Sequence, residues 1–102
     1  MESNDFLQMG GHKIALVLDD KDNVGVVLAD VIAGDACRIR GRGEEYDLSA
    51  VEDVAFGHKV ALSALKKGDP IYKYGEEIGT AREDIPQGGW IHSHNLYCER
   101  GM

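Results

Sequence analysis

Two histidines near the C-terminal end of the sequence have a spacing that suits metal or proton chemistry. They lie in His92-Ser93-His94-Asn95, directly after Trp90-Ile91. If this stretch is a strand, side chains two residues apart share a face, with backbones roughly 7 Å apart and rings able to converge. Such imidazoles can share a divalent metal ion, or one can bind it while the other moves protons. The pair alone also fits two half-exposed histidines on a strand edge, and a third ligand has no diagnostic spacing.

A second set of residues offers positive charge for an anionic ligand. It comprises Gly57-His58-Lys59 and Lys73-Tyr74-Gly75, although a surface lysine is usually solvated and a tyrosine often packs with its hydroxyl outward. The formal net charge of the chain is −7, so its long-range field repels anions and an anion site must concentrate cations locally. We therefore expect a carboxylate site built from His58, Lys59, Lys73, His92 and His94.

Other charged segments have simpler interpretations. Asp19-Asp20-Lys21-Asp22-Asn23 lacks the glycine and terminal glutamate of an EF-hand and is read as a solvated turn. Arg38-Ile39-Arg40-Gly41-Arg42 precedes Glu44-Glu45, which indicates local charge pairing or a subunit contact. Glu76-Glu77 is more consistent with a solvated turn than with an acid/base pair.

An internal repeat determines the expected fold class. Four segments share the pattern aliphatic-x-x-Gly-x-x-apolar, in which glycine frees the backbone for a tight turn and a short strand follows. Their first four residues are Val31-Ile32-Ala33-Gly34, Val54-Ala55-Phe56-Gly57, Leu65-Lys66-Lys67-Gly68 and Ile85-Pro86-Gln87-Gly88. The repeats are too short and too irregularly spaced for a solenoid, and they favour a compact body of short, bent strands.

The rest of the chain supports a mainly β domain. Residues 12–18 and 24–28 read as two antiparallel strands of a hairpin, whereas 48–55 and 61–67 can support only a helical turn or two. Residues 1–11 are polar and are expected to be a flexible leader, followed by a single domain over 12–102.

Composition excludes several classes of partner. With 11 Lys+Arg against 18 Asp+Glu, the chain does not fit a nucleic-acid binder or a protein of anionic membrane surfaces. Its apolar runs are far shorter than the roughly 20 residues of a membrane span. The N-terminus lacks the features of a signal peptide, so a cytoplasmic location is expected, with Cys37 and Cys98 as reduced thiols.

Four motifs stand in the order in which they occur in one enzyme family. They are Asp22-Asn23-Val24, Gly57-His58-Lys59-Val60-Ala61-Leu62, Lys73-Tyr74-Gly75-Glu76 with Ile78-Gly79, and Gly88 followed by His92-Ser93-His94-Asn95. Over residues 12–96 the chain resembles the N-terminal SAF-type domain of the altronate/galactarate dehydratase family. The resemblance implies a β-clip fold, in agreement with the bent strands and glycine corners expected above.

The resemblance also implies an activity. Members of the family eliminate water from sugar acids with a divalent metal ion, typically iron, and related two-subunit enzymes eliminate sulfite from sulfolactate. Such reactions need a base, an acid, and cations or a Lewis acid to hold the enediolate. Carried onto this chain, the resemblance makes His92 and His94 metal-side or acid/base residues, and makes Lys59 and Lys73 contacts of the carboxylate. The resemblance also implies that His58, Tyr74 and Asn95 belong to the substrate site. Lys73 or Tyr74 would be able to transfer a proton. Asn95 would form a hydrogen bond with the substrate or orient a histidine.

The family's long enzymes continue into large catalytic domains, whereas this sequence ends at Met102. We therefore expect a separate large lyase subunit that holds most of the Fe²⁺ site and of the pocket for an anionic substrate, and we leave a homo-oligomer open. The leading hypothesis is the small subunit of a two-component sugar-acid dehydratase. The alternatives are the small subunit of a sulfolactate-type sulfo-lyase and a non-catalytic SAF module that binds an anionic sugar or a protein. A purely structural β module would leave the His-x-His motif unexplained.

Overall fold

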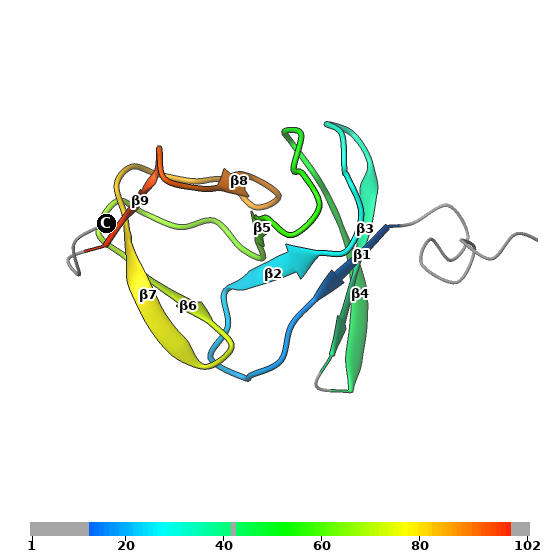
Figure 1. Ribbon diagram of the computed structural model, residues 1–102, viewed down its shortest axis with the longest axis horizontal. Helices are drawn as coiled ribbons and strands as arrows, with labels where there is room; N and C mark the ends of the chain where they lie inside the picture. The colour runs from blue at the N-terminus through cyan, green and yellow to red at the C-terminus, as the bar shows by residue number, and fades with distance from the viewer. Residues whose placement is uncertain (1–12, 42, 99–102) are drawn as a thin grey trace, which may run out of the picture.

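The computed structural model describes residues 13–41 and 43–98, and every regular element in these ranges is a β-strand (Figure 1). Six strands form one curled sheet in the order β4-β3-β1-β2-β5-β8, and three form a second sheet in the order β6-β7-β9. The strands are β1 (Lys13–Leu16), β2 (Val24–Val27), β3 (Ala36–Gly41), β4 (Glu44–Ser49), β5 (Lys59–Ala61), β6 (Pro70–Lys73), β7 (Glu76–Ala81), β8 (Trp90–Ile91) and β9 (Leu96–Tyr97). The mainly β, β-clip prediction is confirmed, and no helical turn forms at 48–55 or 61–67.

The N-terminal half follows the expected pairing. β1 and β2 form the antiparallel hairpin, with Ala15 opposite Val27, and β3 runs parallel to β1 on its other side. β4 returns antiparallel to β3, so that the side chains of Arg38 and Arg40 meet acidic partners on β4. Both arginines form ion pairs with Glu45, and the first also pairs with a second carboxylate on that strand. The two described arginines of the basic stretch are therefore neutralised locally, as the sequence indicates.

The turn between β1 and β2 differs from its expected solvated form. Asp22 is only 8% exposed, and its carboxylate accepts backbone N–H groups from Leu18, Asp19 and Gly75. The third of these belongs to the β6–β7 hairpin, and the Asn23 side chain adds two hydrogen bonds to the backbone of β6. Three N–H donors replace the water that the Asp22 carboxylate loses on burial, and these hydrogen bonds offset the cost of its desolvation. The turn thus connects the two sheets.

The repeat forms the corners of the fold, as predicted. Its four glycines all have left-handed φ angles, +95° at Gly34, +85° at Gly57, +93° at Gly68 and +84° at Gly88. The turns associate in pairs, because Val31 forms an antiparallel bridge with Val54 and Leu65 forms one with Ile85. The repeat therefore supplies both the bends and the contacts between them.

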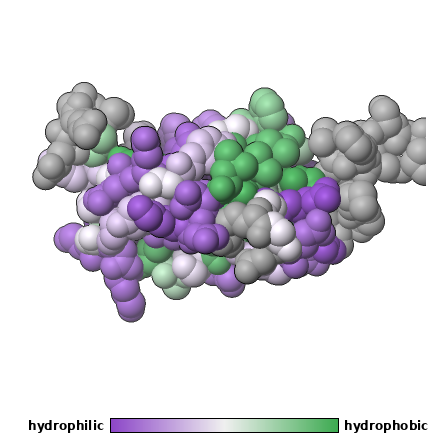
Figure 2. Space-filling view, turned by 90° about the horizontal axis from the view of Figure 1, so that it is seen from below, coloured by the Kyte–Doolittle hydropathy of each residue, from purple (hydrophilic) through white to green (hydrophobic). Residues whose placement is uncertain are grey.

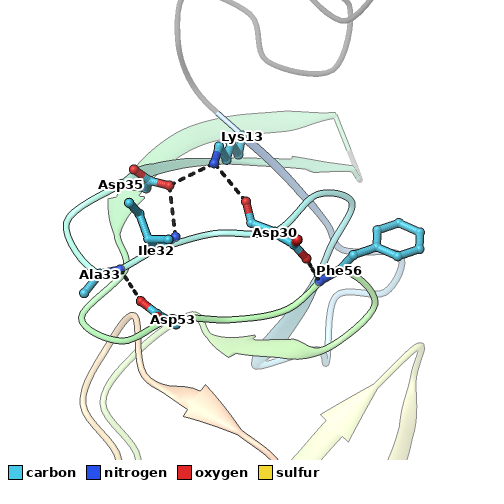
Figure 3. Close-up of polar contacts among 7 residues, drawn as sticks. All are labelled: Lys13, Asp30, Ile32, Ala33, Asp35, Asp53 and Phe56. Carbon is cyan, nitrogen blue, oxygen red and sulfur yellow. Dashed lines mark hydrogen bonds and ion pairs between the residues drawn. The ribbon is translucent and has the colours of Figure 1, made fainter.

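An aspartate fixes each turn of the first pair, and the sequence analysis did not identify it. The Asp30 carboxylate accepts the N–H of Phe56 at 2.8 Å, and Asp53 accepts the N–H of Ala33 at 3.0 Å, so the two turns cap each other (Figure 3). In the second pair Asp84 does the same for one turn. All three aspartates directly precede the aliphatic residue of the repeat, so the full pattern of these turns is Asp-aliphatic-x-x-Gly.

Two hydrophobic clusters fill the interior. One lies between the strands of the N-terminal half and includes Ile39, whereas the other includes Ile71, Ile85 and Ile91 of the C-terminal half. The surface drawn in Figure 2 is mostly hydrophilic, with one large hydrophobic patch and smaller ones elsewhere. None of the described residues forms a helix long and apolar enough to cross a membrane.

Gly88 and Gly68 allow the corner geometry to be tested with a matched pair of alanine variants. Both have φ near +90°, and a non-glycine residue there costs about 1–2 kcal/mol. An added Cβ at Gly68 meets open space, whereas at Gly88 it collides with the backbone carbonyl oxygen of Ser49. We expect Gly88→Ala to lower the free energy of unfolding by about 1–3 kcal/mol more than Gly68→Ala does. Urea denaturation measures both, and equal losses would contradict the steric argument.

Candidate functional site

The His-x-His motif lies in a turn, not in the strand that its spacing suggested. β8 ends at Ile91, and His92 to Asn95 form a tight turn that leads into β9. The carbonyl oxygen of His92 accepts the N–H groups of both Asn95 and Leu96, which closes the turn. The alternation of faces therefore does not apply to this pair. What brings the two rings together is a shared neighbour.

That neighbour is Trp90, the only tryptophan of the chain. Its ring lies 5.5 Å from that of His92, nearly parallel, and 4.7 Å from that of His94. Its indole N–H donates to Nδ1 of His58 at 3.1 Å, and the ring of His58 stacks on that of His92 at 4.6 Å. We call these four side chains the ring cluster. Sequence reasoning missed Trp90, although an aromatic residue two positions before His92 was a usable signal.

Pairing of β5 with β8 assembles the cluster from distant segments. Lys59 lies opposite Ile91 in this antiparallel pair. The residues before and after them, His58 and His92, are therefore neighbours across the sheet, as their stacked rings show. The Gly-His-Lys and His-x-His motifs, 34 positions apart, thus meet at one end of the larger sheet.

The buried side chain of Asn95 holds the turn in place through hydrogen bonds to the backbone. It is 3% exposed, its Oδ1 accepts the N–H of His92 at 2.9 Å, and its Nδ2 donates to the carbonyl of Trp90 at 2.8 Å. The carboxylate of Glu52 accepts the N–H of Trp90 at 3.0 Å. Of the two roles expected for Asn95, these contacts favour the orientation of His92, since both polar atoms of the amide are already engaged.

Lys59 directly follows His58 of the ring cluster, and Lys73 lies close enough to Lys59 to affect its charge. Burial lowers the pKa of Lys59, and the positive charge of Lys73 lowers it further. Within residues 13–41 and 43–98 neither lysine forms an ion pair with a carboxylate. The structure thus gathers the five predicted cationic side chains in one region, with positive charge that is not neutralised locally.

Tyr74 is placed differently. It and Gly75 form the two-residue turn between β6 and β7, and both have positive φ. The Gly75 N–H donates to Asp22, which ties this turn to the β1–β2 loop. The Nζ atom of Lys73 lies 5.2 Å from the centre of the Tyr74 ring, and this is the contact that links Tyr74 to the predicted site in the described part of the chain.

A cavity of about 410 Å³ opens beside the ring cluster. Lys59 and His92 line it, together with Arg82, Ser93 and Tyr97. Arg82 was not identified from the sequence, because a single arginine after a strand does not differ from an ordinary surface residue. A second, larger cavity of about 590 Å³ lies along β7 and includes Glu76 and Glu77, which are exposed strand residues and not part of a turn.

The described residues do not form a complete metal site by themselves. Among residues 13–41 and 43–98, no group of three or more His, Cys, Asp or Glu side chains converges on one point. The Nδ1 atom of His58 already accepts the indole N–H of Trp90. His92 and His94 can therefore provide at most part of a ligand set. Cys37 and Cys98 are both free, the first buried and the second half-buried.

Comparison with known proteins agrees with the motif order. The altronate/galactarate dehydratase SAF domain family matches residues 13–99. The (2R)-sulfolactate sulfo-lyase subunit alpha of Paracoccus pantotrophus is 42% identical over 64 residues, which are 63% of this chain and 96% of that subunit. Its counterpart in Chromohalobacter salexigens is 30% identical over 88 residues, 83% of this chain and 94% of that one. Altronate dehydratase of Bacillus subtilis is 37% identical over 83 residues, but these make up only 16% of the dehydratase.

The crowding of cations predicts how His92 titrates. Burial, and then the charges of His58, Lys59 and His94, hold its pKa below the ordinary value of 6.5. Because the unfolded chain binds this proton more readily, protonation of His92 lowers the free energy of unfolding as the pH falls below that value. We expect Lys59→Met to raise the pKa of His92, and Lys66→Met, which changes an exposed turn lysine, to leave it unchanged. NMR titration of the ring protons measures both, and a parent pKa at or above 6.5 would contradict the electrostatic interpretation.

Proposed function

Because the chain belongs to the altronate/galactarate dehydratase SAF domain family, we propose that it is the small subunit of a two-subunit lyase acting on a hydroxy-acid carboxylate. The observation that carries the proposal is the ring cluster beside two lysines that no carboxylate in the described part of the chain neutralises. An excess of positive charge at one point of a chain with net charge −7 fits an anionic substrate.

The chemistry of such a lyase matches the groups present. A base removes the proton from the carbon beside the carboxylate. The electron pair of the broken C–H bond then forms a carbon–carbon double bond, and the leaving group departs from the next carbon with the electrons of its own bond. The enol product then tautomerises to a 2-oxo acid. In our proposal His92 and His94 move these protons. Both side chains are exposed, on a turn that the hydrogen bonds of the buried Asn95 keep in position, and this supports the role. Lys59, Lys73 and His58 would bind the carboxylate and the negative charge that develops on it.

A partner subunit would complete this site. The His92 to Asn95 turn lies on the surface, so the chain provides one wall of a pocket and does not exclude water from the reacting groups. The sulfo-lyase relatives are themselves named as alpha subunits. In our proposal the partner covers the ring cluster and holds most of the ligands of a divalent ion, for which Fe²⁺ is the candidate. When bound, such an ion supplies a Lewis acid for the enediolate.

Two leaving groups remain candidates. Water is the leaving group in the dehydratase relatives, and sulfite fits the sulfo-lyase relatives. Sulfite is kept as the second candidate because the chain matches nearly the whole of the two sulfo-lyase subunits, 96% and 94% of their length. It matches only 16% of the altronate dehydratase. A non-catalytic module that binds an anionic sugar or a protein is the alternative from another class.

The lyase proposal is tested with the chain alone and with the subunit that co-purifies with it from the native host. With ferrous iron, we expect the complex to convert altronate, galactarate or (2R)-sulfolactate to a 2-oxo acid, and the chain alone to show negligible turnover. Sulfite release, measured separately, identifies the leaving group. Within the complex, His94→Ala should lower kcat by about 100-fold or more, with assembly unchanged by size-exclusion chromatography.

Lys66→Ala is the matched control, because it removes a cation from an exposed turn that does not adjoin the ring cluster. It should retain full activity. If His94→Ala also retains full activity, the assignment of the His-x-His motif is wrong. A stable complex that turns over none of the three acids would favour the binding module.

A further inference from the structure

The wall of the cavity beside His92 carries more positive charge than the binding of one carboxylate, as proposed above, would use. Lys59, Arg82 and His92 line it, whereas His58 and His94 do not, and no acidic residue of the described chain is part of its wall. Arg82 contributes a full positive charge that the chemistry proposed above does not use. An anion is the ligand that such a wall favours.

Arg82 is attached to the turn that carries the histidines. Its backbone N–H donates to the carbonyl of Asn95 at 2.8 Å, and its Nη1 donates to the carbonyl of Ser93 at 3.4 Å. The second contact is long, and no carboxylate of residues 13–41 and 43–98 pairs with the guanidinium. The group is thus held near the cavity with most of its N–H donors available. The chain's other described arginines differ in this respect, because both pair with acidic residues on β4.

We propose that this cavity binds a second acidic group of the substrate, and that Arg82 is the residue that selects for it. The inference rests on the proposed function, in which the first carboxylate lies at Lys59 and the ring cluster. The ligand is a small hydroxy acid with two anionic ends, the second being a sulfonate or a carboxylate. Both present two or more oxygens to a guanidinium, which binds them through parallel N–H donors.

The size of the cavity agrees with such a ligand. Small-molecule sites in proteins range over about 300–1,000 Å³, and about 410 Å³ accommodates a short hydroxy acid. His92 belongs both to the cavity wall and to the ring cluster, and Lys59 lines the cavity next to that cluster. One anionic end can therefore contact them while the other reaches Arg82. A substrate with a single acidic end would leave the guanidinium without a partner.

A binding experiment on the isolated full chain tests the subsite without requiring lyase activity. Sulfate and methanesulfonate serve as probes, and backbone amide shifts are followed by NMR. We expect both anions to shift the amides of Arg82, Ser93 and their neighbours, and we expect Arg82→Gln to weaken this binding about 10-fold or more. Arg82→Lys should restore part of it. Arg40→Gln is the matched control, since that guanidinium pairs with Glu45 on the opposite hairpin.

A kinetic experiment on the assembled enzyme tests selection. Arg82→Gln should raise KM about 10- to 100-fold for acids with two anionic ends, galactarate or sulfolactate, with less than about a 3-fold change for altronate, which has one. Anion shifts that are the same in Arg82→Gln and Arg40→Gln would overturn the subsite, as would equal changes of KM for both kinds of acid. If anions bind through Arg82 but the complex is inactive on all three acids, the subsite stands and the lyase proposal fails.

Discussion

The paired glycine turns are the constraint on which the rest of the molecule depends. Each turn needs a residue in the left-handed region, and each must meet a partner turn from a distant part of the chain. In the first pair the reciprocal bonds of Asp30 and Asp53 lock this association. The turn ending at Gly57 leads directly into His58 and Lys59, and the turn ending at Gly88 leads into Trp90 and the His92 turn. The same corners that shape the scaffold therefore deliver the two halves of the candidate site.

The site itself stores unfavourable electrostatic energy. Desolvation, and then the positive charges gathered without local carboxylates in the described chain, disfavour the charged forms of Lys59 and His92 and lower the pKa of each. An anion bound between them relieves the repulsion and stabilises the charged forms. The free protein thus has its positive groups already in place, held by the backbone and by Asn95, before a ligand arrives. Groups arranged in this way are more typical of function than of stability.

What could be predicted from the sequence follows from how local each feature is. The left-handed corners could be predicted because four consecutive residues are enough to indicate a glycine turn. The order of the motifs indicated the family. The pairing of the turns was not visible, since it depends on contacts between residues 20 or more positions apart, such as Val31 with Val54. Asp22 looked like one more solvated acid, because one of the three N–H groups that replace its water belongs to the distant Gly75. The spacing of the His-x-His motif suggested a strand because alternation is a local rule, whereas the hydrogen bonds of the buried Asn95 hold the segment as a turn.

Small size explains why the site is open. A domain of this length buries two modest clusters and has little interior left for a private pocket. The candidate histidines sit on a turn between strands of only two residues, β8 and β9. The position of this turn depends on polar bonds from Asn95, Glu52 and Arg82 and on the burial of Ile91 in the second hydrophobic cluster. Arg82 belongs to this support through its backbone and to the cavity through its side chain. In the subsite proposed above, the residue that helps to hold the histidine turn also contacts the far end of a bound anion, and this would couple the shape of the turn to the identity of the ligand.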